Sequence, residues 1–290
     1  RAIAFLNARR STDSPFALCV GLIAPHFPFV VPEPFFSQYF PDYADLPELP
    51  AGHLDSLPVA SKRLRRLFGF WGHTDEQVRR ARAAYYGLIS YADSKIGEIL
   101  EVLDQTGLAN NTVVVHTSDH GEMLGEHGLW RKMSFYEQSV RVPLQIRWPG
   151  RSVPGQRIPE CVSLVDVTAT LIDAAGADSP GFDGHSLVGL VDQSERARTM
   201  WSDEVFAEDT SHGTDRPRAM LRRGHWKFCM SGGKDPEAEL YNLTEDPGEF
   251  VNRSGDKDIK DIESDMRNSL LERWEPEIID AKVRAHQDSA

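Results

Sequence analysis

The sequence predicts an α/β protein with a mostly parallel central sheet flanked by helices, followed by a small C-terminal α+β subdomain with an antiparallel sheet. Short apolar runs rich in β-formers end in polar loops, which is typical of buried parallel strands. A long amphipathic helix pattern separates two of these runs, as in a crossover connection. From about residue 196, short strand-like segments alternate with turn signals, which indicates an antiparallel meander. We therefore assign residues 1–195 to the α/β domain and 196–290 to the subdomain.

The first expected strand is Phe16–Ile23, the continuous apolar run FALCVGLI. It leads into the proline-rich segment APHFPF. Residues Val30–Gly72 are rich in Pro, Asp, Leu and aromatic residues and show no sustained period. We expect a long ordered loop that covers one end of the sheet, because excursions of this length in compact domains are usually functional.

The strongest helix signal begins at Thr74, which forms a capping-box pattern with Gln77. Apolar residues then recur at helical spacing from Val78 to Leu103, and Gly107 is a suitable residue to end the helix. The next strand is expected at Thr112–Ser118.

Three further elements follow along the chain. A short strand is expected at Val142–Arg147, and a helix at Asp166–Ala175 that Gly176 closes. One amphipathic helix is expected at Asp258–Arg284, after the strands of the antiparallel meander.

Composition limits the classes of function. The chain has 290 residues and a formal net charge of −12, with its 32 Lys and Arg residues dispersed. A nucleic-acid partner is not expected, because such binding needs a concentrated basic face. No apolar run approaches the roughly 20 residues that span a bilayer, so we expect a soluble protein without a membrane span. A cytoplasmic and a periplasmic location in a bacterium both stay open.

The three cysteines are far apart and form no C-x-x-C pair. Neither a zinc site nor a disulfide framework is indicated. Cys19 and Cys161 lie in apolar runs, so we expect buried core thiols there.

Asp119 and His120 end the strand at Thr112–Ser118. Ligands of open α/β sheets bind at the carboxyl ends of strands, and a carboxylate next to an imidazole can ligate one metal ion. The alternative is that Asp119 caps the following turn and His120 packs in the core. The order H-x-E-x-x-x-E-H excludes a zincin helix, so His127 is expected to be structural.

Lys132 and His26 are the candidate anion-binding and catalytic residues. Lys132 lies in an aromatic segment just after the expected metal site, where an ammonium group could neutralise an oxyanion. His26 follows the first expected strand and is a candidate proton donor if its loop faces Asp119. A solvated lysine and a histidine packed among aromatic residues are the alternatives.

The segment TSDHGEMLGEHGLWRKMSFYEQSVRVPLQIRWPG resembles the metal-and-lysine segment of type I sulfatases, within the alkaline-phosphatase superfamily. The stretches PFALCVGLIAPHFPF and RRGHWKFCMSGGKDPEAELYNLTEDPGE are also similar to that family. Within it, the motifs are most similar to the choline-sulfatase and iduronate-sulfatase-like branches. The resemblance implies an alkaline-phosphatase-like fold, incomplete here at the N-terminus, and hydrolysis of a sulfuric ester.

The resemblance also implies roles for single residues. Asp119 and His120 would be two ligands of a divalent metal, usually Ca²⁺, with Mn²⁺ or Mg²⁺ as alternatives. Lys132 would contact the oxygens of the sulfate. His26 would contact the sulfate and help the alcohol to leave by protonation.

One departure from the family is decisive for what the chain can do. Sulfatases carry a Cys/Ser-x-Pro-x-Arg motif whose first residue becomes the formylglycine nucleophile, and this motif is absent. The chain corresponds to the C-terminal part of a sulfatase and is expected to be inactive alone. Its expected partners are a small sulfate ester and the missing N-terminal half of the catalytic domain, and an oligomer stays open. The alternatives are a phosphonate monoester or phosphodiester hydrolase of the same superfamily, and a truncated non-catalytic chain.

Overall fold

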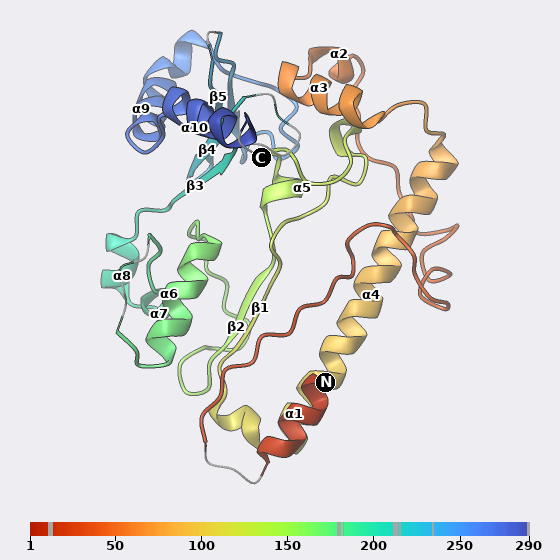
Figure 1. Ribbon diagram of the computed structural model, residues 1–290, viewed down its shortest axis with the longest axis vertical. Helices are drawn as coiled ribbons and strands as arrows, with labels where there is room; N and C mark the ends of the chain where they lie inside the picture. The colour runs from red at the N-terminus through yellow and green to blue at the C-terminus, as the bar shows by residue number, and fades with distance from the viewer. Residues whose placement is uncertain are drawn as a thin grey trace. The chain divides into compact units, whose positions relative to one another are not determined.

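The computed structural model of the chain describes residues 1–10, 14–178, 181, 183–210, 214, 216–233 and 235–288. The chain forms two compact units that interleave along the sequence (Figure 1). The first unit comprises Arg1–Glu48, Trp71–His116 and Leu144–Gly150, and the second Leu49–Phe70, Thr117–Pro143 and Arg151–Ala290. The division expected at residue 196 stays a prediction.

Two helices pack together in the first unit, α1 (Ala2–Arg9) and the long α4 (Asp75–Gln105) (Figure 1). The start of α4 confirms the predicted capping box. The Thr74 hydroxyl accepts from the Gln77 backbone at 3.3 Å, and the Gln77 side chain accepts from the Thr74 backbone at 2.8 Å. Gly107 adopts the left-handed conformation after the helix, with φ of 77°, and a 3-10 turn at Leu108–Asn111 follows.

The strands β1 (Val114–Thr117) and β2 (Leu144–Arg147) form a two-stranded sheet. They lie inside the two runs predicted at Thr112–Ser118 and Val142–Arg147. Both predictions are confirmed, with shorter strands than expected.

The strand predicted at Phe16–Ile23 is wrong for this structure, which assigns no strand there. Most of the segment is exposed, from Leu18 at 38% to Ile23 at 86%. A buried strand needs a hydrogen-bonded neighbour and cover on both faces, and the described residues pair no strand with this run. Cys19 is exposed for the same reason, contrary to the expected burial, and Cys161 is half-buried.

In the second unit, four antiparallel strands form a sheet in the order β3-β4-β5-β6, which confirms the predicted meander. Leu221 lies opposite Phe228, which lies opposite Leu240. These three side chains pack with Met266 and Trp274 in a hydrophobic core. Helix α9 covers this face of the sheet (Figure 1). The strands span Glu204–Asp209, Arg218–Arg223, Trp226–Ser231 and Ala238–Asn242.

The single helix predicted at Asp258–Arg284 is divided in the structure. A 3-10 turn at Lys257–Ile259 leads into α9 (Lys260–Leu271), and α10 (Pro276–Asp288) follows after a break. Pro276 has no backbone N–H and is tolerated at a first helical position but not in a helix interior. Trp274, in the break, is only 1% exposed.

The excursion at Val30–Gly72 was expected to be a loop, but part of it is helical. Helices α2 (His53–Ser56) and α3 (Val59–Phe68) belong to the second unit. The helix predicted at Asp166–Ala175 is confirmed as α6 (Leu164–Ala174). The remaining short helices are α5 (Glu137–Val140), α7 (Val188–Val191) and α8 (Glu195–Met200).

A second hydrophobic cluster supports the segment after β1. It contains Leu64, Phe70, Met123, Leu129, Met133, Tyr136 and Tyr241. The loop that follows Asp119 and His120 therefore packs against a hydrophobic cluster. Among the helices of the described residues, none is both long enough and apolar enough to cross a membrane.

Candidate metal and anion site

Asp119 and His120 lie side by side just beyond the end of β1. The Asp119 carboxylate is exposed, with 84% of its side chain accessible, and its Oδ2 lies 3.5 Å from His120 Nε2. Its Oδ1 accepts from the His120 backbone at 3.1 Å. The carboxylate is thus held toward the imidazole rather than capping a later turn.

The other ring nitrogen of His120 is 2.7 Å from the carbonyl oxygen of Gly121. A carbonyl only accepts, so Nδ1 carries a proton and donates, which makes Nε2, beside Asp119, the ring nitrogen that can ligate a metal. Metal-binding histidines are commonly oriented in this way, by a hydrogen bond from the second nitrogen. The pair fits a divalent cation. Within the described residues no group of three His, Cys, Asp or Glu side chains gathers around a metal position, so this is a partial ligand set.

Gly121 is required by a close approach of the chain. A Cβ at this position would lie 2.0 Å from the carbonyl oxygen of Gln138. The Gly121 N–H donates to the carbonyl of Ser139 at 2.7 Å. The residue after the metal pair is therefore pinned to helix α5.

The loop between Gly121 and Lys132 closes on itself. The Glu122 carboxylate accepts from the Arg131 backbone at 2.5 Å and from the Leu124 backbone at 3.3 Å. The Met123 N–H donates to the Arg131 carbonyl, and Gly125 donates to Leu129, both at 2.8 Å. These hydrogen bonds bring Arg131, the residue before Lys132, next to Glu122 and Met123 at the start of the loop.

Lys132 meets α5 through its backbone. The Ser139 hydroxyl donates to the Lys132 carbonyl at 2.5 Å. Ser139 is 2% exposed and also holds Gly121 through its own carbonyl. One buried residue thus joins the metal pair and the candidate anion-binding lysine.

His127 lies in the base of the loop and is structural, as predicted. It is 1% exposed, its Nδ1 lies 2.9 Å from His53 Nε2, and its ring stacks on Tyr136 at 3.7 Å between centroids. Burial, with the neighbouring His53 and Lys227, lowers the pKa of His127 to about 3. The ring is neutral at physiological pH and serves packing.

His26 belongs to the first unit, whereas Asp119, His120 and Lys132 belong to the second. Its Nδ1 is 2.8 Å from the Phe27 carbonyl, and its ring stacks on Phe27. Within the second unit, Ser139 connects the backbone of Lys132 to Gly121, the residue after the Asp119–His120 pair. The role of His26 stays a prediction.

Sequence reasoning missed the buried ionic cluster that anchors α5. Lys227, fully buried on β5, lies 2.8 Å from Glu137 and 2.7 Å from Glu249. Glu249 also accepts from the Glu137 backbone at 2.6 Å, and Arg222 pairs with Glu137 at 2.8 Å. Burial opposes ionisation of Glu137, but Lys227 and Arg222 prevail and lower its pKa. A lysine among apolar residues in WKFCM was the available signal.

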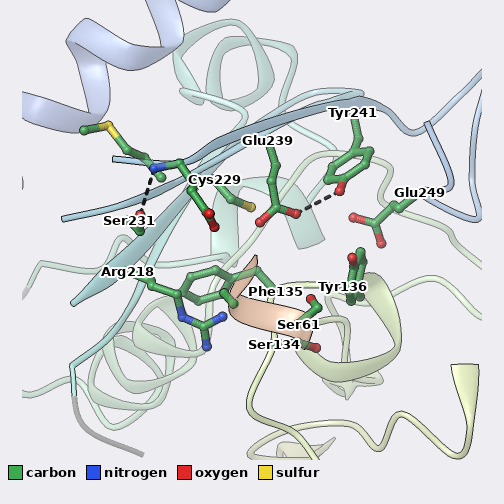
Figure 2. Close-up of a pocket in the computed structure, with 13 residues that line it drawn as sticks. Ser61, Ser134, Phe135, Tyr136, Arg218, Cys229, Ser231, Glu239, Tyr241 and Glu249 are labelled. Carbon is green, nitrogen blue, oxygen red and sulfur yellow. Dashed lines mark hydrogen bonds between the residues drawn. The ribbon is translucent and has the colours of Figure 1, made fainter. Parts of the chain in front are cut away.

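A small polar cavity lies between this anchor and the sheet (Figure 2). Figure 2 shows Glu239 and Tyr241, hydrogen-bonded at 2.8 Å, on the side opposite Tyr136 and Ser61. The Tyr136 hydroxyl and Arg218 Nε are buried without a hydrogen-bond partner among the described residues. The cavity measures about 20 Å³, room for about one water molecule. Burial raises the pKa of Glu239, and the cavity is too small for an organic substrate.

Comparison with known proteins adds the family context. The sulfatase family model matches residues 1–177. A second model, described as the C-terminal region of N-sulphoglucosamine sulphohydrolase, matches residues 125–275.

Individual relatives agree with these matches. The chain is 36% identical over 283 residues to a choline-sulfatase of Rhizobium meliloti, covering 94% of this chain and 53% of the relative. It is 32% identical to an arylsulfatase of Clostridium perfringens, covering 94% and 56%. The chain therefore spans about half the length of these curated relatives.

Solved structures support the predicted fold class. A phosphonate monoester hydrolase of Agrobacterium radiobacter superposes with a TM-score of 0.77 at 27% identity, covering 93% of this chain and 59% of that one. A Bacteroides fragilis protein described as a sulfatase superposes at 0.74 with 23% identity, which supports the fold alone.

Proposed function

Because the chain belongs to the sulfatase family, we propose that it forms part of a hydrolase that cleaves a sulfate monoester at a divalent-metal site. The observation that carries this proposal is the pairing of Asp119 and His120, with Nε2 turned toward the carboxylate at 3.5 Å. Ser139 hydrogen-bonds both to the backbone of Lys132 and to that of Gly121, the residue after this pair.

Each residue has a distinct task in this proposal. Asp119 and His120 hold the cation, and the family uses a divalent metal. Carboxylate oxygens favour Ca²⁺ and leave Mg²⁺ as an alternative, while the imidazole, a softer ligand, makes Mn²⁺ the other alternative. When bound, the cation supplies a positive charge that polarises the sulfur–oxygen bonds.

The other two residues act on the ester itself. The ammonium group of Lys132 binds sulfate oxygens and stabilises charge that develops on them. His26 donates a proton to the oxygen of the leaving alcohol, which makes departure easier. The nucleophile motif is absent from the sequence, so the complementary partner is the remainder of a sulfatase catalytic domain.

The metal proposal is tested by calorimetric titration of the chain with Ca²⁺, Mn²⁺ and Mg²⁺. Asp119→Asn is expected to weaken binding at least roughly tenfold, because a neutral amide replaces a charged ligand. Asp258→Asn, an exposed acid on the C-terminal subdomain, is the matched control and should leave binding unchanged. Equal affinities for unaltered chain and Asp119→Asn would reject the metal site.

The catalytic proposal is tested by joining the chain to the remaining N-terminal part of the Rhizobium choline-sulfatase. Aryl-sulfate hydrolysis is expected from the joined protein and not from the chain alone. Lys132→Ala should abolish most of it. Turnover by the chain alone at rates typical of the family would contradict the proposal.

A second candidate is a phosphonate monoester hydrolase, favoured by the Agrobacterium structure. Sulfate esters and phosphonate monoesters both present a tetrahedral group with several oxygens, so either substrate suits the proposed metal and lysine. Comparing aryl sulfate with an aryl phosphonate monoester on the joined protein separates the two. The higher kcat/KM identifies the function.

A further inference from the structure

Ser139 makes two hydrogen bonds that lead to different parts of the candidate site. Its carbonyl accepts from the Gly121 N–H at 2.7 Å, next to the metal pair. Its hydroxyl donates to the Lys132 carbonyl at 2.5 Å. At 2% exposure Ser139 is shielded from water that could replace either contact. Ser139 therefore connects the residue next to the metal pair directly to the backbone of Lys132, in addition to the hydrogen bonds that Glu122 and Met123 make with Arg131.

The position of Ser139 is itself anchored to the C-terminal sheet. Its N–H donates to the carbonyl of Tyr136, the residue before helix α5, at 2.8 Å. The same helix begins at Glu137, which Arg222, Lys227 and Glu249 contact from β4, β5 and the loop after β6, respectively. Helix α5 is thus tied through Glu137 to strands β4 and β5 and to Glu249.

We propose that the Ser139 hydroxyl is a positioning group for anion recognition, holding Lys132 in register with Asp119 and His120. This inference rests on the proposed roles of those three residues. Ser139 does not touch the substrate in this proposal. It acts by restricting the backbone from which the ammonium group reaches the sulfate.

The two contacts can be separated by substitution. Ser139→Ala removes the hydroxyl that holds Lys132 but keeps the carbonyl that holds Gly121. Ser139→Thr retains a hydroxyl. Ser134→Ala is the matched control, because Ser134 is a buried serine of the same segment whose hydroxyl meets Met123 Sδ at 3.2 Å instead of the Lys132 backbone.

The experiment titrates the full chain with inorganic sulfate in saturating Ca²⁺ and follows binding by calorimetry. Ser139→Ala is expected to weaken sulfate binding roughly three- to tenfold, the effect of one lost hydrogen bond, while Ca²⁺ affinity stays the same. Ser139→Thr should recover most of the affinity, and Ser134→Ala should match the unaltered chain. Amide hydrogen exchange at Gly121 should be unchanged in Ser139→Ala, because the carbonyl contact remains.

A double-mutant cycle with Lys132→Ala decides whether the effect acts through Lys132. No further loss from Ser139→Ala in the Lys132→Ala background supports positioning, whereas the same loss in both backgrounds overturns it. If Lys132→Ala weakens binding and Ser139→Ala does not, this inference fails and the proposed function stands. If the unaltered chain binds no sulfate, or Lys132→Ala has no effect, the proposed role of Lys132 fails first.

Discussion

Gly121 shows how a single missing side chain shapes the candidate site. Its position lies against the backbone of Gln138, so the turn after Asp119 and His120 can form only if no Cβ is present. Gly97, on an exposed face of α4, has nothing within 4 Å of a would-be Cβ. The two glycines therefore predict opposite effects of the same substitution.

Gly121→Ala should lower the free energy of unfolding by about 1–3 kcal/mol, because the backbone must shift to relieve the overlap. Gly97→Ala should raise it by about 0.5–1 kcal/mol, because alanine is a better helix former. Urea unfolding of both variants gives the two values. A neutral Gly121→Ala would show that the close approach to Gln138 is not maintained in solution.

His127 predicts how stability depends on pH. Its pKa is about 3 in the folded chain, against a usual value near 6.5, because it is buried beside His53. The unfolded chain then binds the proton more readily, so this stabilisation is complete above about pH 6.5 and is lost as the pH falls toward 3. The expected slope is about 1.4 kcal/mol per pH unit in that window.

Unfolding measured between pH 4 and pH 7 tests this slope. His127→Phe retains an aromatic ring against Tyr136 but cannot take up a proton. Its stability should depend on pH less steeply than that of the unaltered chain. Equal slopes in the two proteins would assign the acid sensitivity to other groups.

For single residues, the sequence predicts which side chains can bind a metal better than it predicts which residues contact each other in the fold. Asp119 and His120 are recognisable because they interrupt a strand with ligand-type side chains. Ser139 is not recognisable, because its importance depends on contacts with Gly121 and Lys132 that the fold creates.

Helix α4 is the element best predicted from sequence, because its signals are local. Thr74 and Gln77 satisfy each other's backbone groups at its start. The strand expected at Phe16–Ile23 is the opposite case. A strand is completed by its neighbours, and no local pattern shows whether those neighbours are present.

Thr74→Ala should destabilise the chain by about 1 kcal/mol, the usual cost of removing a helix cap. Thr74→Ser keeps the accepting oxygen and should cost much less. Hydrogen exchange at the Gln77 amide provides the local readout, and faster exchange is expected in Thr74→Ala alone. Unchanged exchange would mean that water caps the helix equally well.

The buried ionic cluster links helix α5 to strand β5. Lys227→Met should cost about 3–5 kcal/mol, because it leaves the buried Glu249 without its cation. Adding Glu249→Gln should recover part of this loss, since the second change removes an uncompensated charge. Thermal or urea unfolding of the single and double variants measures the difference. A double variant less stable than Lys227→Met would contradict this explanation.

For the molecule as a whole, periodicity predicts the α/β class and the antiparallel C-terminal sheet correctly. The interleaving of the two units could not be predicted, because it depends on contacts between segments far apart in sequence. The net charge of −12 is also a property of the whole chain, and any anion that binds an acidic protein needs a local positive charge, the role proposed for Lys132.

The exposed apolar segment Phe16–Ile23 predicts self-association. An exposed apolar run that no strand of the described residues pairs with is a template for another strand. Val20→Lys should reduce association in sedimentation velocity experiments. Val251→Lys, at an exposed valine elsewhere, should not. Equal association in the two variants would place the contact on another surface.

The same segment would also affect how long a chain that leaves it uncovered persists in a cell. Holdase chaperones bind exposed apolar chain, and proteases remove molecules that stay in that state. A copy whose Leu18, Leu22 and Ile23 remain uncovered is exposed to both. Its abundance would then depend on how quickly another surface covers these residues, so a defect in covering would appear first as a shorter lifetime.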